Sequence, residues 1–96
     1  MADIFLINPV QVDDDREVRF LEQWIRQANF ARTQNGLVSM NLHRSVDPEP
    51  HFRFVIIEQW NSIKAWEDSQ QLADNGGFRH NYPCPHYPGV YRVYSK

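Results

Sequence analysis

The ten residues HFRFVIIEQW, at positions 51–60, constrain the fold more than any other stretch of the chain. Side chains alternate between the two faces of a β-strand. One face then carries Phe52, Phe54, Ile56, Glu58 and Trp60. Val55 and Ile57 lie on the opposite face between Arg53 and Gln59. A strand that is apolar on both faces has to be covered on both sides.

The segment that begins the chain predicts another strand at residues 3–8, DIFLIN. Ile4, Leu6 and Asn8 would share one face of it. Pro9 is expected to limit this strand because proline lacks the N–H group that a β-ladder needs. Asn8 is therefore a polar amide on an apolar strand face.

Residues 13–36 predict a helix with both ends marked. Asp14 and Glu17 have the spacing of a capping box, and Asn35-Gly36 is typical of a helix stop. The apolar stripe at 3.6-residue spacing comprises Leu21, Trp24, Ile25, Ala28 and Ala31.

The remaining elements complete the pattern. LVSMNLHRSV, at 37–46, alternates as a strand, with Val38, Met40 and Leu42 on one face. A second helix is expected to start after Asn61 or Ser62 and to end near residues 75–77. Residues 78–88 hold three prolines and are expected to be irregular, and GVYRVY, at 89–94, predicts the last strand.

The order β-α-β-β-α-β predicts one ferredoxin-like α+β domain over residues 1–96, with both helices on one face of the sheet. The uncovered face is apolar as well. We therefore expect a second copy of the chain to cover it, giving a homodimer.

Composition excludes several functional classes. Ten basic and twelve acidic side chains give a net charge of −2 with no basic cluster, so no nucleic-acid partner is expected. No stretch approaches a membrane span, and the start does not have the pattern of a signal peptide. With a single cysteine, Cys84, a reducing compartment fits, and we expect a cytoplasmic protein.

Several motifs together carry a family resemblance. FLEQW, NGLVSMNLHRS, FRFVIIEQWNSIKAW, FRH and YRVY, in that order, resemble the antibiotic biosynthesis monooxygenase family over nearly the whole chain. The resemblance implies a dimeric α+β barrel. Characterised members of the family include cofactor-free oxygenases of polyketide quinols, quinol monooxygenases and haem-degrading enzymes, and many other members have no established activity.

The resemblance further implies a pocket between the helices and the sheet. Asn8 matches a first-strand asparagine of the haem degraders, and Trp66 matches a tryptophan on their second helix. Their histidine has no counterpart at the same spacing, because His80 and His86 lie in the irregular segment. In the polyketide oxygenases Asn, Trp, Tyr and Arg side chains are implicated, for which the resemblance offers Asn8, Trp66, Tyr82 and Arg79, with Asn8 and Trp66 matched by position.

The residues themselves leave alternatives open. Trp60 is best explained as core, whereas Trp66 either packs on the sheet or flanks a planar ligand. Asn8 either caps a backbone group or points at a ligand, because an unpaired buried amide costs a few kcal/mol.

The irregular segment holds the other candidates. His80, Tyr82 and His86 are either ordinary loop residues or proton-transfer groups. H-x3-C-x-H, formed by His80, Cys84 and His86, is a weak metal motif, and Cys84 has no activating cation at fixed spacing.

We therefore expect a monooxygenase that oxidises a small planar phenol or quinol with O2. The expected site residues are Asn8, Trp66, His80, Tyr82 and His86, with neither a metal nor another cofactor. The alternative is a non-catalytic dimer of the same fold that binds a small ligand or haem.

Overall fold

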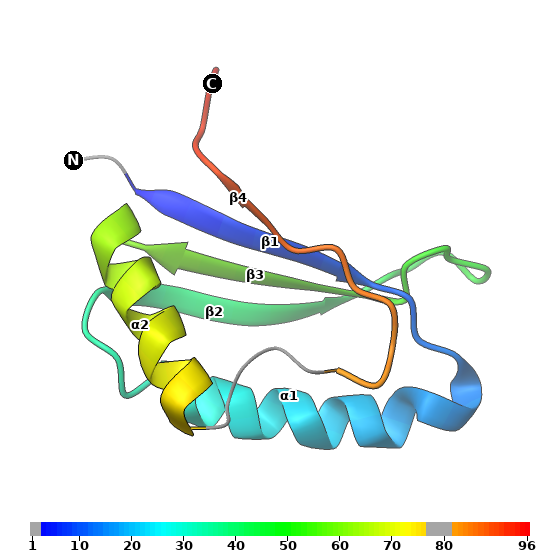
Figure 1. Cartoon of the computed structure of the whole chain (residues 1–96). Coiled ribbons are helices and arrows are strands. Elements are labelled where there is room, and N and C mark those ends of the chain that lie inside the picture. Colours follow the sequence, from blue (N-terminus) through cyan, green and yellow to red (C-terminus); the bar gives the residue numbers. More distant parts are fainter. Residues whose placement is uncertain (1–2, 77–81) are drawn as a thin grey trace.

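The computed structural model describes residues 3–76 and 82–96 of the chain (Figure 1). The elements are β1 (Ile4–Val10), a 3₁₀ turn η1 (Asp14–Arg16), α1 (Glu17–Ala31), β2 (Leu37–Arg44), β3 (Phe54–Trp60), α2 (Ile63–Gly76) and β4 (Gly89–Tyr91). The strands form an antiparallel sheet in the order β2-β3-β1-β4, and α1 and α2 lie on the same face of it (Figure 1). This confirms the predicted ferredoxin-like α+β fold. Among the described residues, no helix is long and apolar enough to cross a membrane.

The strand that dominates the sequence pattern is central in the sheet, where β3 pairs with both β1 and β2. Its predicted alternation is confirmed, because Phe54, Ile56, Glu58 and Trp60 are buried while the residues between them are half-buried. Trp60 is completely buried, in agreement with its predicted core role. The strand begins at Phe54, three residues later than predicted.

The expectation that Pro9 limits the first strand is wrong, because β1 continues through Val10. The carbonyl oxygen of Pro9 accepts a hydrogen bond from the backbone N–H of Tyr87 at 3.1 Å, and Gln11 N–H donates to Pro85 at 2.9 Å. Pro9 therefore removes one donor from the ladder without ending it. The predicted face of Ile4, Leu6 and Asn8 is the buried one.

The apolar face of α1 is rotated from the predicted stripe. Phe20 is completely buried, whereas Ile25 is 51% exposed. At about 100° per residue, Phe20 projects near the direction of Ala28 and Ala31, and Ile25 lies well to the side. Phe20 stacks on Phe54 at a centroid distance of 5.1 Å, so this ring sets the position of the helix on the sheet.

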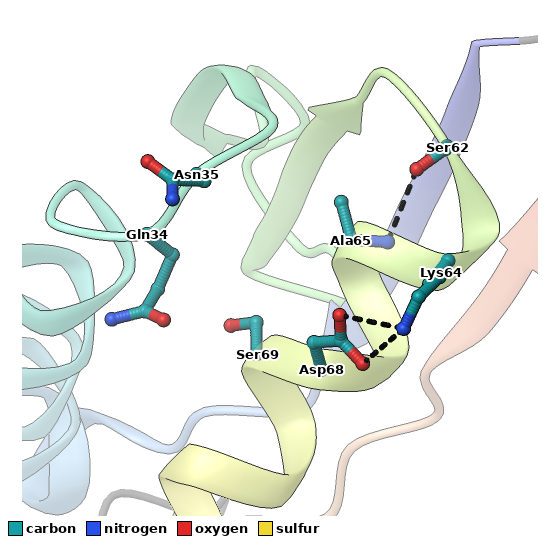
Figure 2. Close-up of a pocket in the computed structure, with 7 residues that line it drawn as sticks. All are labelled: Gln34, Asn35, Ser62, Lys64, Ala65, Asp68 and Ser69. Atoms are coloured by element: carbon teal, nitrogen blue, oxygen red, sulfur yellow. Dashed lines mark hydrogen bonds and ion pairs between the residues drawn. The ribbon is translucent and has the colours of Figure 1, made fainter.

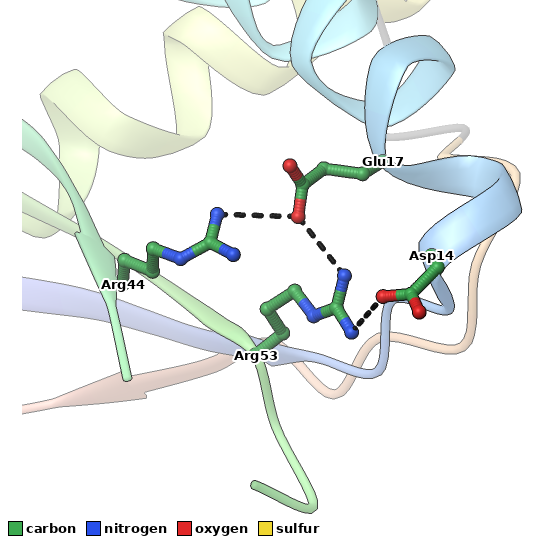
Figure 3. Close-up of polar contacts among 4 residues, drawn as sticks. All are labelled: Asp14, Glu17, Arg44 and Arg53. Carbon is green, nitrogen blue, oxygen red and sulfur yellow. Dashed lines mark hydrogen bonds and ion pairs between the residues drawn. The ribbon is translucent and has the colours of Figure 1, made fainter. Parts of the chain in front are cut away.

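The predicted capping box is wrong as well. In the described structure, neither the start of η1 nor that of α1 has a side-chain cap. Figure 3 shows that Asp14 and Glu17 instead bind Arg53, and that Glu17 also binds Arg44 at 3.1 Å. These ion pairs join η1 and the start of α1 to β2 and to the residue before β3. They raise the pKa of Arg53, through its hydrogen bond to Asp14 first and that to Glu17 second.

The outer strands also differ from the prediction. A register shift between Leu37 and Ser39 places Val38 on the exposed side, so that the core-facing residues of β2 are Leu37, Met40 and Leu42. This β-bulge breaks the strict alternation read from the sequence. At the other edge, β4 covers only Gly89–Tyr91 of the predicted 89–94.

One of the two predicted capping residues, Ser62, caps the start of α2. The hydroxyl oxygen of Ser62 accepts a hydrogen bond from Ala65 N–H at 3.1 Å. Gly36, with φ of 93°, lets the preceding turn approach this helix, because a Cβ there would lie 2.5 Å from the Cβ of Ala65.

Candidate functional site

Asn8 lies at the centre of a buried polar group on the helix-facing side of the sheet. It has no exposed surface and stands opposite Ile56 on β3. Its Oδ1 accepts a hydrogen bond from Tyr87 N–H at 3.1 Å. Its Nδ2 is buried and has no hydrogen-bond partner among the described residues. Asn8 thus caps a backbone group with one end of its amide and leaves the other end unpaired within this part of the chain.

Glu58 belongs to the same face and was not among the predicted site residues. It pairs with Leu6 on β1, so it is a diagonal neighbour of Asn8, at about 7–8 Å along the sheet. Its side chain is 2% exposed, and Oε1 accepts a hydrogen bond from the indole N–H of Trp60 at 2.9 Å. Burial raises the pKa of Glu58, an effect that the Trp60 hydrogen bond opposes.

Tyr82 joins this group from the segment that follows α2. It is 6% exposed, and its ring lies 5.0 Å from that of Phe20. Burial raises the pKa of Tyr82 above its ordinary value of 10.0, and the nearby charge of Glu58 raises it further. Tyr82 therefore remains a phenol at neutral pH.

His86 lies next to Tyr82, with ring centroids 5.5 Å apart in an edge-to-face arrangement. The His86 backbone bridges to Val10, two residues beyond Asn8. Nδ1 of His86 lies 2.9 Å from the carbonyl oxygen of Cys84. A carbonyl only accepts, so in neutral His86 the proton is on Nδ1 and Nε2 is left unprotonated to act as a base.

The structure brings Asn8, Tyr82 and His86 together, and Trp66 lies on α2. The indole N–H of Trp66 is buried without a hydrogen-bond partner in the described part of the chain, and the same holds for Trp24 on α1. The predicted residues His80 and Arg79 lie outside the described residues. The weak metal motif includes His80, so it too lies partly outside the described residues.

Cys84 is buried and has a free thiol. Burial raises its pKa, although Arg16 partly opposes that effect. A thiol with a raised pKa is a poor nucleophile, which agrees with the absence of an activating motif in the sequence.

A surface cavity lies elsewhere, between the α1–β2 connection and the start of α2. It measures about 400 Å³, and Figure 2 shows its lining residues Gln34, Asn35, Ser62, Lys64, Ala65, Asp68 and Ser69. Lys64 and Asp68 neutralise one another through hydrogen bonds of 3.1 and 3.2 Å. None of the predicted site residues that the structure describes lines this cavity. We therefore place the candidate chemistry in the buried group around Asn8.

The fold and this buried group define the class of protein: a ferredoxin-like α+β domain with polar side chains enclosed between helices and sheet. The family model of antibiotic biosynthesis monooxygenases matches residues 3–80. The chain belongs to the antibiotic biosynthesis monooxygenase family. No curated protein matches the sequence.

Solved structures share the fold. A protein of Shewanella loihica PV-4 described as a candidate monooxygenase is 25% identical, with a TM-score of 0.86 and coverage of 99% of this chain and 97% of that one. SnoaB, a cofactor-independent oxygenase from Streptomyces nogalater, is 17% identical, with a TM-score of 0.76 and coverage of 100% and 97%. A candidate antibiotic biosynthesis monooxygenase from Bordetella bronchiseptica is 21% identical, with a TM-score of 0.74 and coverage of 100% and 99%. The family supports a monooxygenase-type function.

Proposed function

We propose that the protein is a cofactor-independent monooxygenase that oxidises a small planar phenol or quinol with O2. The observation that carries the proposal is the pair of buried N–H groups, Asn8 Nδ2 and Trp66 Nε1, without partners among the described residues. A buried unpaired donor costs about 1–3 kcal/mol. A phenolic oxygen accepts such a bond, so a bound substrate would offset that cost.

In this mechanism the substrate supplies all the electrons. A base removes a phenolic proton, and the electron-rich anion reacts with O2 at a ring carbon. One oxygen atom stays in the product and the other leaves as water. For 1,4-dihydroxynaphthalene the product is 2-hydroxy-1,4-naphthoquinone, which has two hydrogens fewer and one oxygen more than the substrate.

Each predicted site residue has a role in the proposed mechanism. Asn8 Nδ2 donates to the substrate oxygen and stabilises the developing anion. Trp66 flanks the ring. Tyr82 donates a hydrogen bond, and His86 Nε2, or His80, moves protons. The apolar rings of Phe20 and Phe54 keep water away from the anion.

The test is oxygen uptake with 1,4-dihydroxynaphthalene, corrected for its spontaneous oxidation. Asn8→Asp keeps an acceptor for Tyr87 N–H and removes the side-chain donor, so the rate should fall roughly 10²–10³-fold. Trp66→Phe keeps a ring and loses the N–H, so a smaller fall is expected. Asn35→Ala, at the exposed turn, is the control. A wild-type protein without turnover, or unchanged turnover in both site variants, contradicts the proposal.

The alternative is a non-catalytic dimer that binds a small ligand or haem. The same unpaired donors would be satisfied by a ligand that is only held. A tight complex without oxygen uptake would favour this function. Haem binding is measured separately, as a Soret shift on mixing with hemin.

We also propose that the protein is a homodimer formed through the open face of the sheet. The helices cover one face only (Figure 1). Phe5, Ile7, Val55 and Ile57 stay half-buried on the other face. Tyr91 in β4 is 54% exposed, and Tyr94, which follows β4 in the chain, is 101% exposed. An apolar surface of this kind is typical of a protein interface.

A further inference from the structure

Glu58 is a buried carboxyl group with no cation beside it among the described residues. The residues that flank it in the sheet are Leu6 on β1 and Met40 on β2, and both are buried. Within the described chain, its hydrogen-bond partner is the indole of Trp60, and its charge raises the pKa of Tyr82. A buried carboxylate is costly unless it is paired, so a purely structural role would be served better by a neutral side chain.

The position of Glu58 favours a chemical role. It shares the helix-facing side of the sheet with Asn8, whose unpaired Nδ2 is the proposed binding group for the substrate oxygen. Trp60 occupies only Oε1 of the carboxyl group. The Tyr82 hydroxyl approaches from the segment after α2 and remains protonated. A donor and a base therefore lie on the same buried face of the sheet, and a second buried donor comes from the segment after α2.

We propose that Glu58 is the proton acceptor for the phenolic hydroxyl of the substrate, an assignment that rests on the proposed oxygenase function. The carboxylate takes the phenolic proton, and the O–H bond of the substrate breaks as the new O–H bond forms on Glu58. The resulting anion adds to O2 at a ring carbon to give a peroxide.

The same proton completes the cycle. Glu58 returns it to the peroxide oxygen. The oxygenated ring carbon then loses its own proton, which breaks the O–O bond and releases hydroxide. The hydroxide combines with this second proton to form water. The carboxylate is regenerated, and no reductant besides the substrate takes part. A base with a raised pKa suits this task because it holds the proton between the two steps.

Glu58→Gln tests the assignment because it keeps the shape and an acceptor for Trp60 while removing the base. Product formation from 1,4-dihydroxynaphthalene should fall roughly 10²–10⁴-fold at pH 7. The rate of the variant should then recover with pH, by about tenfold per unit, as the substrate phenol ionises without help. A residue that only supports Trp60 would not change the pH profile. Glu67→Gln, at an exposed position on α2, is the matched control and should behave as wild type.

The outcomes separate the two proposals. Wild-type turnover together with an unchanged rate and pH profile in Glu58→Gln overturns the role of Glu58 alone. A wild-type protein that forms no oxygenated product overturns both. If Glu58→Gln fails to fold by near-ultraviolet circular dichroism, the wild-type profile decides. The turnover rate of the wild type must fall at acidic pH as Glu58 takes up a proton. A rate that does not change with pH in that range contradicts the assignment.

Discussion

At the residue scale, Asn8 uses the two ends of its amide differently. The oxygen accepts from Tyr87 N–H and so fixes the proline-rich segment against β1, while the nitrogen has no partner among the residues that the structure describes. A residue with only a structural role would be expected to satisfy both ends. The unpaired Nδ2 is therefore the atom of the site that a bound ligand is expected to satisfy.

Glu58 leads to a prediction about stability. Folding raises its pKa above the ordinary 4.5, so the folded state favours the protonated form. The contribution to stability is then complete below about pH 4.5 and is lost as the pH rises through the folded pKa. Glu58→Gln should match wild type in melting temperature at pH 4 and exceed it by several degrees at pH 8.

The measurement is the melting temperature of both proteins by circular dichroism from pH 4 to pH 8. The difference between the two proteins cancels the contributions of all other titrating groups. A difference in melting temperature that stays constant with pH, or a variant that is less stable at pH 8, would show that the buried Glu58 carboxylate does not lower the stability of the folded protein. Together with lost turnover, a more stable variant would place Glu58 among residues kept for chemistry rather than for folding.

Much of the residue-scale picture could be predicted from alternation alone. Asn8 is recognisable as a polar residue on an apolar strand face, and Glu58 falls on the same face as Trp60 in the printed sequence. Alternation gives the face of a residue but not its neighbours. The neighbours of Glu58 in the described chain, Tyr82 among them, depend on the tertiary arrangement of strands and segments.

At the element scale, the departures from the sequence pattern have local causes. The bulge at Val38 arises from pairing with β3, which β2 alone does not reveal. The face of α1 is set by the stacking of Phe20 on Phe54, a contact between residues 34 positions apart in sequence. The acidic residues at the start of α1 bind Arg53 instead of the helix backbone, because a cation from the hairpin reaches them (Figure 3).

A prediction at this scale concerns Ser62, the N-cap residue of α2. It caps α2, the helix that presents Trp66, by accepting from Ala65 N–H. Ser62→Ala should lower the free energy of unfolding by about 0.5–2 kcal/mol, and Ser62→Asp should restore most of that loss because aspartate is also a good N-cap. Urea unfolding followed by tryptophan fluorescence measures both. Equal destabilisation by the two substitutions would contradict a capping role.

At the scale of the whole molecule, topology was the most predictable feature. The order of strand and helix signals leaves few arrangements, and the ferredoxin-like sheet is one of them. The site was less predictable, since Tyr82 and His86 reach Asn8 only because the segment after α2 returns along β1. No periodicity marks that return in a stretch with three prolines.

The proposed dimer is tested at the same scale by sedimentation equilibrium at micromolar concentration. Wild type should sediment at twice the 11.4 kDa chain mass. Ile57→Lys places a charge on the open face and should shift the population to monomer, whereas Val46→Lys, at a fully exposed position of the hairpin, should not. A monomeric wild type would contradict the proposed interface.

The central claim is that the buried group around Asn8 supports insertion of oxygen from O2 into a quinol without an added cofactor. Its most direct test is turnover of 1,4-dihydroxynaphthalene by the wild-type protein under ¹⁸O2, with mass spectrometry of the product. The account predicts 2-hydroxy-1,4-naphthoquinone carrying one ¹⁸O atom. Unlabelled 1,4-naphthoquinone with hydrogen peroxide, the products of spontaneous oxidation, would contradict it.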